Sequence, residues 1–223
     1  MEEKSESERK TFQTVRPEFT RGEVPLKYSY TFSKGERLDV SQDENGIAYI
    51  GITRGEKSIF DASRLLPPDF KFVTPTYFIK SIKEYRLEDY HYNTSGWAVS
   101  PDRKMVLVGE FRSPRDLLTL LHEIGHVQSP DKKLGSVTRS GKEARIRSRE
   151  ERRAWAWAIS TFRKIEKDTG IDFRTVFPTQ KELKRHIDNY LASHRQFWEQ
   201  YLGNDPTFSL ESRKLFDKVD RRS

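Results

Sequence analysis

The chain contains no cysteine. Disulfide bonds, thiolate metal ligands and a cysteine nucleophile are therefore excluded, so any metal ion must be held by histidine, aspartate or glutamate. Long apolar runs are absent too, since MVLVG, LLTLL and AWAWAI fall far short of the roughly 20 residues that a membrane-spanning helix needs. The opening segment MEEKSESERK has no apolar stretch of the kind found in secretory signals. We therefore expect a cytoplasmic protein that contacts no membrane.

The composition is polar, with 34% charged and 34% hydrophobic residues among 223. Fourteen Phe, nine Tyr and four Trp still supply enough apolar mass for the core of one sizeable domain. A net charge of +7 permits binding to nucleic acid. Acidic residues are interspersed almost everywhere, however, and the clearest excess of basic residues is in residues 142–153 and at the C-terminal end. A basic surface without a nucleic-acid partner is therefore the favoured interpretation, and nucleic acid remains possible.

The first half of the chain has the pattern of β structure. Residues 1–16 are charged and serine-rich, which predicts a disordered tail. Residues 23–72 contain alternating apolar and polar positions, and Asn45-Gly46 predicts a tight hairpin turn between two strands. A short amphipathic helix is expected from Thr74. A second hairpin is expected over residues 95–111.

The second half has the pattern of helices. Ser113 is a suitable N-cap and Pro114 a suitable first residue for a helix that runs through Val127. Further helices are predicted over residues 143–167, residues 179–202 and residues 209–219, with Thr179 and Glu182 forming a capping box.

The order of these elements, strands first and helices second, predicts an α+β fold. We expect a tail over residues 1–16, one domain over residues 17–170, and a C-terminal helical extension over residues 171–223 that packs on it.

Two histidines stand four residues apart in LLHEIGHV, residues 120–127. Positions i and i+4 lie one turn apart on the same helix face, so His122 and His126 can converge on one ion. Gly125 leaves space for a neighbouring element. Glu123 is displaced around the helix and can reach a metal-bound water rather than the metal. This H-E-x-x-H arrangement predicts two zinc ligands and a carboxylate general base.

A catalytic zinc site needs a third protein ligand. No histidine follows the motif closely, which makes a carboxylate the better candidate. The helix predicted over residues 143–167 offers Glu143, Glu150 and Glu151. Its expected packing side consists of Ala154, Trp157, Ala158 and Ile159. Glu151 lies on this side and Glu150 is rotated by about 100°, so we expect Glu151 to be the ligand and keep Glu150 and Glu143 as alternatives.

Two segments resemble zincin metallopeptidases of the gluzincin branch. LLHEIGHV resembles their active-site helix, and residues 151–158 (ERRAWAWA) are similar to the E-x-x-A-[DN]-x-[FW]-A glutamate helix of ImmA/IrrE-type peptidases and minigluzincins. The resemblance covers about residues 104–165. Trp155 departs from it, because it stands where those relatives often have Asp or Asn, so a supporting hydrogen bond would come from elsewhere.

The resemblance implies a zincin-like fold, in which a small sheet packs on the active-site helix and a glutamate helix follows. It implies Zn²⁺ held by His122, His126 and Glu151, with Glu123 as the general base for hydrolysis of a protein or peptide substrate. By the same resemblance, the strand at residues 105–111 would line the cleft and pair with an extended substrate. Tyr190, His186 and His194 are possible oxyanion donors.

Two other functions remain open. The domain could be a zinc-containing regulatory or binding module without peptidase activity, although an intact Glu123 argues against a purely structural site. It could also be a basic nucleic-acid-binding protein, but no helix-turn-helix or zinc-finger signature is present.

Overall fold

The computed structural model describes residues 26–74, 97–100, 104–128 and 141–202. The strands in these ranges are β1 (Lys27–Thr31), β2 (Glu36–Gln42), β3 (Ala48–Arg54), β4 (Lys57–Asp61), β5 (Lys71–Val73), β6 (Ala98–Ser100) and β7 (Met105–Leu107). The helices are η1 (Ala62–Leu65), α2 (Asp116–Val127), α3 (Gly141–Thr169), η2 (Phe173–Thr175) and α4 (Gln180–Leu202). The tail predicted over residues 1–16 and the helices predicted after Thr74 and over residues 209–219 lie outside the described residues.

A four-stranded antiparallel sheet in the order β1-β2-β3-β4 forms the first layer. The hairpin predicted at Asn45-Gly46 is confirmed, because β2 and β3 pair on either side of it and Gly46 has a φ of 77°. The Asp43 carboxylate accepts hydrogen bonds from the amides of Asn45 (2.9 Å) and Ile47 (2.8 Å) and so closes the loop. Alternate residues of β2 and β3 are buried and turn one face of the sheet toward the helices.

The second sheet has three strands in the order β5-β7-β6. β6 and β7 pair antiparallel, as predicted for the hairpin within residues 95–111, while β5 pairs parallel with β7. Residues 105–107 thus form a central strand with a neighbour on each side. Among the described strands, β6 forms one edge of this sheet, and it also lies against α2.

Helix α2 ends at Val127, as predicted, but its regular part begins at Asp116 rather than at Pro114. The first turn is tighter than an α-helix, since the amides of Asp116 and Leu117 donate to carbonyls three residues back. The predicted cap still operates. The Ser113 hydroxyl accepts from the amide of Arg115 at 3.2 Å, and the Asp116 carboxylate accepts from the amide of Ser113 at 2.8 Å.

Helices α3 and α4 are close to their predicted limits. α3 ends at Thr169, where Gly170 takes a left-handed φ of 72°. The amide of Glu182 donates to the Thr179 hydroxyl at 3.2 Å, which confirms the cap of α4, but the Glu182 carboxylate bonds to Arg115, the residue before α2. The predicted packing side of α3 is partly wrong: Trp155 is completely buried, and Trp157 is only half-buried.

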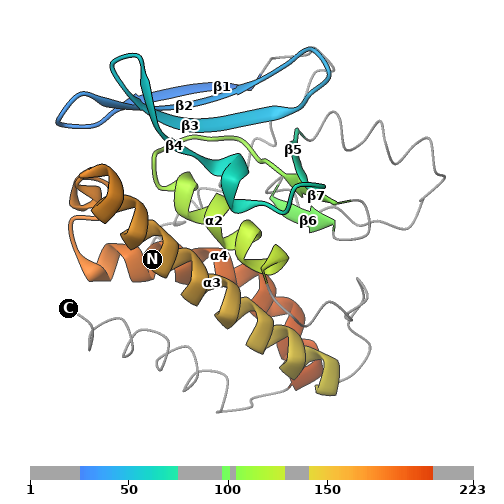
Figure 1. Cartoon of the computed structure of the whole chain (residues 1–223). Coiled ribbons are helices and arrows are strands. Elements are labelled where there is room, and N and C mark those ends of the chain that lie inside the picture. Colours follow the sequence, from blue (N-terminus) through green and yellow to red (C-terminus); the bar gives the residue numbers. More distant parts are fainter. Residues whose placement is uncertain (1–25, 75–96, 101–103, 129–140, 203–223) are drawn as a thin grey trace, which may run out of the picture.

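The chain is therefore a mixed α+β protein with the order predicted from its sequence. Figure 1 shows the four-stranded sheet on one side of α2 and the long helix α3 on the other, with α4 beyond. One large apolar cluster joins the inner face of the sheet to these three helices. No helix in the described ranges combines the length and hydrophobicity of a membrane span. The division into domains and the cytoplasmic location stay predictions.

Candidate functional site

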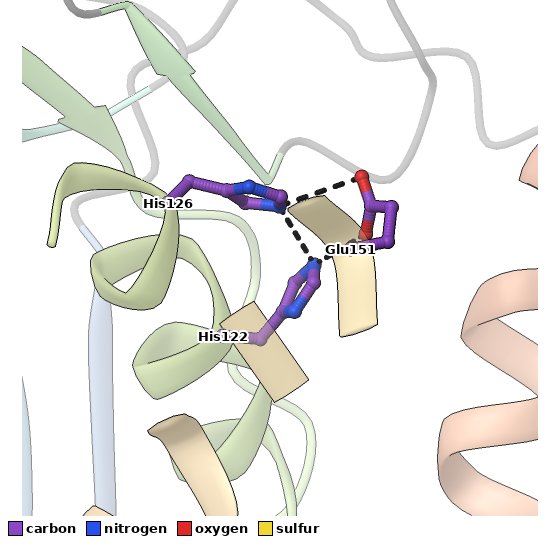
Figure 2. Close-up of side chains that lie close together, drawn as sticks. All are labelled: His122, His126 and Glu151. Carbon is purple, nitrogen blue, oxygen red and sulfur yellow. Dashed lines mark hydrogen bonds and ion pairs between the residues drawn. The ribbon is translucent and has the colours of Figure 1, made fainter. Parts of the chain in front are cut away.

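Three polar side chains from α2 and α3 converge at the crossing of the two helices. The Nε2 atoms of His122 and His126 lie 3.1 Å apart. One carboxylate oxygen of Glu151 is 3.1 Å from His122 Nε2, and the other is 3.4 Å from His126 Nε2. Figure 2 shows the two imidazoles and the carboxylate directed at one another. Among the described residues, these three form the group whose donor atoms can hold one metal ion.

The separations have the size expected for zinc ligands. Donor atoms at about 2.0–2.1 Å from a tetrahedrally coordinated ion lie about 3.3 Å from one another. The measured distances of 3.1, 3.1 and 3.4 Å scatter around this value. Two imidazoles and one carboxylate are also the chemistry of a catalytic zinc site, in which the fourth position takes water. The residues present therefore fit a zinc ion.

The close approach of the two helices depends on Gly125. A Cβ atom at this position would lie 2.6 Å from the carbonyl oxygen of Ala154 and 2.9 Å from its Cα. The space that the sequence predicts at Gly125 is thus filled by the backbone of α3. Because Ala154 lies three residues after Glu151, this contact brings that carboxylate within reach of the histidine pair.

The structure distinguishes two of the three glutamates considered as the third ligand. Glu151 meets both histidines, as the packing-face argument predicts. Glu150 is not part of the group of donor atoms, and its charge raises the pKa of His126. The side chain of Glu143 lies outside the described residues.

Glu123 is buried beside the three converging side chains. Burial raises the pKa of its carboxyl to about 7, although the charge of His126 and a hydrogen bond from the Tyr190 hydroxyl lower it. Tyr190 donates directly to Oε1 of Glu123. A carboxyl with a pKa near neutrality can both accept and release a proton at physiological pH.

The charges of the three converging residues are coupled. Burial lowers the pKa of His126, but the neighbouring Glu151 carboxylate outweighs this effect and raises it to about 9. Burial raises the pKa of Glu151, but the two histidines outweigh it and hold that pKa well below its usual range. Without a metal ion, a proton on His126 therefore balances the Glu151 carboxylate.

Tyr190 belongs to a row of three polar contacts, the polar ladder, that connects α4 to α2 and to the residue just before α2. Arg115 bonds to Glu182 at 2.7 Å, and Thr119 to His186 at 3.1 Å. The hydrogen bond from Tyr190 to Glu123 is the third contact of the ladder. All three pairs are 67 residues apart in the sequence, so α4 runs parallel to α2 with one contact per turn.

Trp155 also lies at the site. Its indole stacks on the imidazole of His122, with ring centroids 4.1 Å apart and planes inclined by 19°. From the sequence, Trp155 is recognised only as a departure from the zincin resemblance, and Tyr190 only as one of three possible oxyanion donors. Their contacts with His122 and Glu123 are not predicted. Polar residues recur every four positions at 115, 119 and 123 and again at 182, 186 and 190. This shared spacing is compatible with the ladder, but the sequence does not show which residue of one helix lies opposite which residue of the other.

The prediction that the strand at residues 105–111 pairs with substrate is wrong for β7. Both edges of Met105–Leu107 are occupied, by β5 and by β6. The edge nearest α2 that remains open within the described part of the chain belongs to Ala98–Ser100.

Comparison of the chain with protein-family models, with curated proteins and with solved structures finds no match.

Proposed function

We propose that the protein is a zinc-dependent peptidase with a zincin-like site of the gluzincin type. The observation that carries the proposal is the convergence of His122, His126 and Glu151 at separations that suit zinc, with the buried carboxyl of Glu123 beside them. In this proposal the two histidines and Glu151 hold Zn²⁺, and Glu123 is the general base.

The chemistry divides between the ion and the protein. Zinc, when bound, supplies a Lewis acid that makes water a nucleophile at neutral pH and polarises the peptide carbonyl. Glu123 accepts the proton of the attacking water at Oε1 or Oε2 and then delivers it to the leaving amine. A pKa of about 7 suits both transfers, because neither protonation state is strongly favoured near neutral pH.

In this mechanism Tyr190 orients the base Glu123 and can also donate a hydrogen bond to the oxyanion. In the substrate-free state its hydroxyl donates to Glu123 and so orients the base. Tyr190 is also in edge contact with the ring of His122, at a centroid distance of 5.2 Å, which keeps the hydroxyl at the site. It is therefore the best placed of the three candidate oxyanion donors. His186 bonds to Thr119, one turn away from Glu123, and the side chain of His194 lies outside the described residues.

The substrate is proposed to be a protein or peptide in extended form. β6 is an edge strand of its sheet within the described residues and contacts α2, so its outer edge suits the addition of a substrate strand. A peptide paired along Ala98–Ser100 would lie beside the helix that carries both histidines.

The proposal is tested by hydrolysis of an unfolded protein and of a quenched-fluorescence peptide library by the zinc-supplied full chain. Glu123→Gln removes the base and keeps the shape of the side chain, so we expect the rate to fall by about 10²-fold or more with zinc content unchanged. Glu110→Gln is the matched control, because Glu110 is exposed and pairs with Arg112. Its rate should equal that of the native chain.

The outcomes separate the candidate functions. Equal rates for the native chain and Glu123→Gln would contradict the role of the base. A chain that binds zinc but cleaves no member of the library would be a zinc-containing binding or regulatory module. Binding to DNA that weakens steeply with salt, together with the absence of hydrolysis, would favour a nucleic-acid-binding protein.

A further inference from the structure

One helix, α3, contacts the ring of His122 in two ways. Glu151 places a carboxylate oxygen 3.1 Å from its Nε2. Four residues later on the same face of the helix, Trp155 covers the plane of the ring, with centroids 4.1 Å apart. His122 and Trp155 are 1% and 0% exposed, so the stacked pair is sealed from water.

The stack restricts the orientation of His122. A ligand histidine binds metal along the lone pair of one nitrogen, so the plane of its ring must be held. Trp155 lies nearly parallel to that ring, at 19°, and the ring of Tyr190 contacts it edge-on at 5.2 Å. Trp155 and Tyr190 also contact each other at 5.5 Å, with planes inclined by 76°. The imidazole therefore lies in a corner made of two aromatic rings, where rotation about its χ2 bond would cause a clash.

The stack also acts on the charge of the ring. A bound zinc ion withdraws electron density from the imidazole and makes it partly positive. The face of an indole is the most electron-rich surface among the aromatic side chains and attracts positive charge placed over it. The stacked pair is thus more favourable with zinc bound than without it. An aliphatic side chain of similar volume would fill the space without this preference.

We propose that Trp155 is a positioning residue that fixes the ring of His122 and strengthens the binding of zinc at this site. The proposal rests on the proposed zinc site and goes beyond its ligands and base. It distinguishes Trp155 from a residue that only fills the core, because core filling affects the stability of the fold without a specific effect on zinc affinity.

The experiment measures zinc affinity by competition with a chromophoric chelator. Five full-length proteins are compared: native, Trp155→Phe, Trp155→Leu, Trp157→Phe and Trp157→Leu. Trp157 is the matched control, since it lies on the same helix and is half-buried against the core. We expect Trp155→Leu to bind zinc about tenfold or more weakly, and Trp155→Phe to recover most of the affinity, to within about threefold of native. The Trp157 variants should bind zinc as the native chain does, even where they lower the melting temperature.

A second readout uses the indole itself. Zinc binding at His122 should change the fluorescence of the tryptophan stacked on it. This change should be present in the native chain and in Trp157→Phe, and absent in Trp155→Phe. Because Phe keeps the ring and most of the volume, Trp155→Phe still identifies the responding indole if Trp155→Leu fails to fold, and an unchanged response in this variant then rejects the proposal.

The results separate the two proposals. A native chain that binds no zinc contradicts the zinc site, and the role of Trp155 is then rejected with it. A native chain that binds zinc, with equal affinity in Trp155→Leu or an unchanged fluorescence response in Trp155→Phe, rejects only the role of Trp155.

Discussion

At the scale of single residues, Glu123 is the group whose environment is most specialised. It is buried and accepts a hydrogen bond from Tyr190, and burial raises its pKa to about 7. The hydrogen bond favours the charged carboxylate and so opposes the effect of burial. In the proposed mechanism, Tyr190 would therefore control both the orientation of Glu123 and the pH at which its carboxyl loses its proton.

Tyr190→Phe should lower kcat/KM by about tenfold or more and leave the zinc content unchanged. Removing the donor raises the pKa of Glu123 further, so the acid limb of the pH profile of kcat/KM should move to higher pH. Steady-state rates between pH 5 and pH 9 measure both effects. Tyr30→Phe, a change in β1 far from the site, is the control. An unchanged profile for Tyr190→Phe would contradict the role of the hydrogen bond.

The proposed zinc site should bind its ion in a pH-dependent way because of His126. Its pKa of about 9 in the metal-free chain means that the imidazole carries a proton at pH 7, whereas zinc needs the neutral ring. Zinc binding at pH 7 should therefore release about one proton, and the affinity should rise by about tenfold per pH unit up to about pH 9. Calorimetry in buffers of different ionisation enthalpy counts the protons. No proton release would show that His126 is not a ligand.

The same shifts predict how the stability of the metal-free chain varies with pH. The pKa of His126 is raised from 6.5 to about 9, so its stabilising contribution is complete below pH 6.5 and is lost as the pH rises through 9. Glu123, raised from 4.5 to about 7, also favours the fold in its protonated form and loses its contribution as the pH rises through 7. The melting temperature in chelator should fall between pH 6.5 and pH 9, and zinc should reverse the fall.

At the scale of elements, the crossing of α2 and α3 determines whether the site can form. The backbone of Ala154 fills the space beside Gly125, so any side chain at position 125 must push the helices apart. The three ligand separations of 3.1–3.4 Å tolerate little of this movement.

Gly125→Ala should therefore destabilise the fold by about 1–3 kcal/mol and weaken zinc binding as well. Thermal unfolding with and without zinc measures the first effect, and chelator competition the second. Ala156→Ser, on the exposed side of α3, should change neither. The clash involves backbone atoms of Ala154, so adding Ala154→Gly should not restore the site. A rescue by this second change would contradict the proposed contact.

The elements themselves could largely be predicted from the sequence, because their signals are local. The Asn45-Gly46 turn, the Thr179 cap and Gly170 after α3 each identify a boundary through one or two residues. Contacts between elements could not be predicted in the same way. The stack of Trp155 on His122 and the ladder from Arg115 to Tyr190 depend on the register between helices, which is determined by the packing of the whole core.

At the scale of the whole molecule, Arg54 connects the sheet to the helices. Its guanidinium bonds to the buried carboxylate of Glu36 at 2.8 Å and to the carbonyl of Thr169, at the end of α3, at 2.6 Å. Burial raises the pKa of Glu36, but the hydrogen bond from Arg54, a backbone hydrogen bond and the charges of Arg54 and Lys34 together outweigh burial and lower that pKa. This contact links the four-stranded sheet to the helix that carries Glu151.

Arg54→Ala should lower the free energy of unfolding by about 1–3 kcal/mol at neutral pH, since it leaves a buried carboxylate without its cation. The lowered pKa of Glu36 means that its contribution is present above pH 4.5 and is lost as the pH falls through the folded value. The difference from the native chain should therefore shrink in acid. Denaturant titration at pH 7 and pH 4 measures it. Arg37→Ala removes an exposed ion pair and should cost less than about 1 kcal/mol.

The candidate site was predictable to different degrees. The histidine pair and Glu123 follow from helix periodicity alone, and Glu151 follows from its place on the packing face of α3. The position of β7 in the middle of its sheet could not be predicted, because the sequence identifies the hairpin but not the strand β5 that joins it from outside. Strand order in a sheet depends on contacts distant in sequence.

The most direct test of the proposed zinc site is the zinc content per chain, by elemental analysis, of the native protein, Glu151→Gln and Glu150→Gln purified identically without chelator. We predict about one zinc in the native chain and in Glu150→Gln, and little or none in Glu151→Gln. A native chain that takes up no zinc when it is offered, or a Glu151→Gln variant that keeps it, would contradict the three-ligand site.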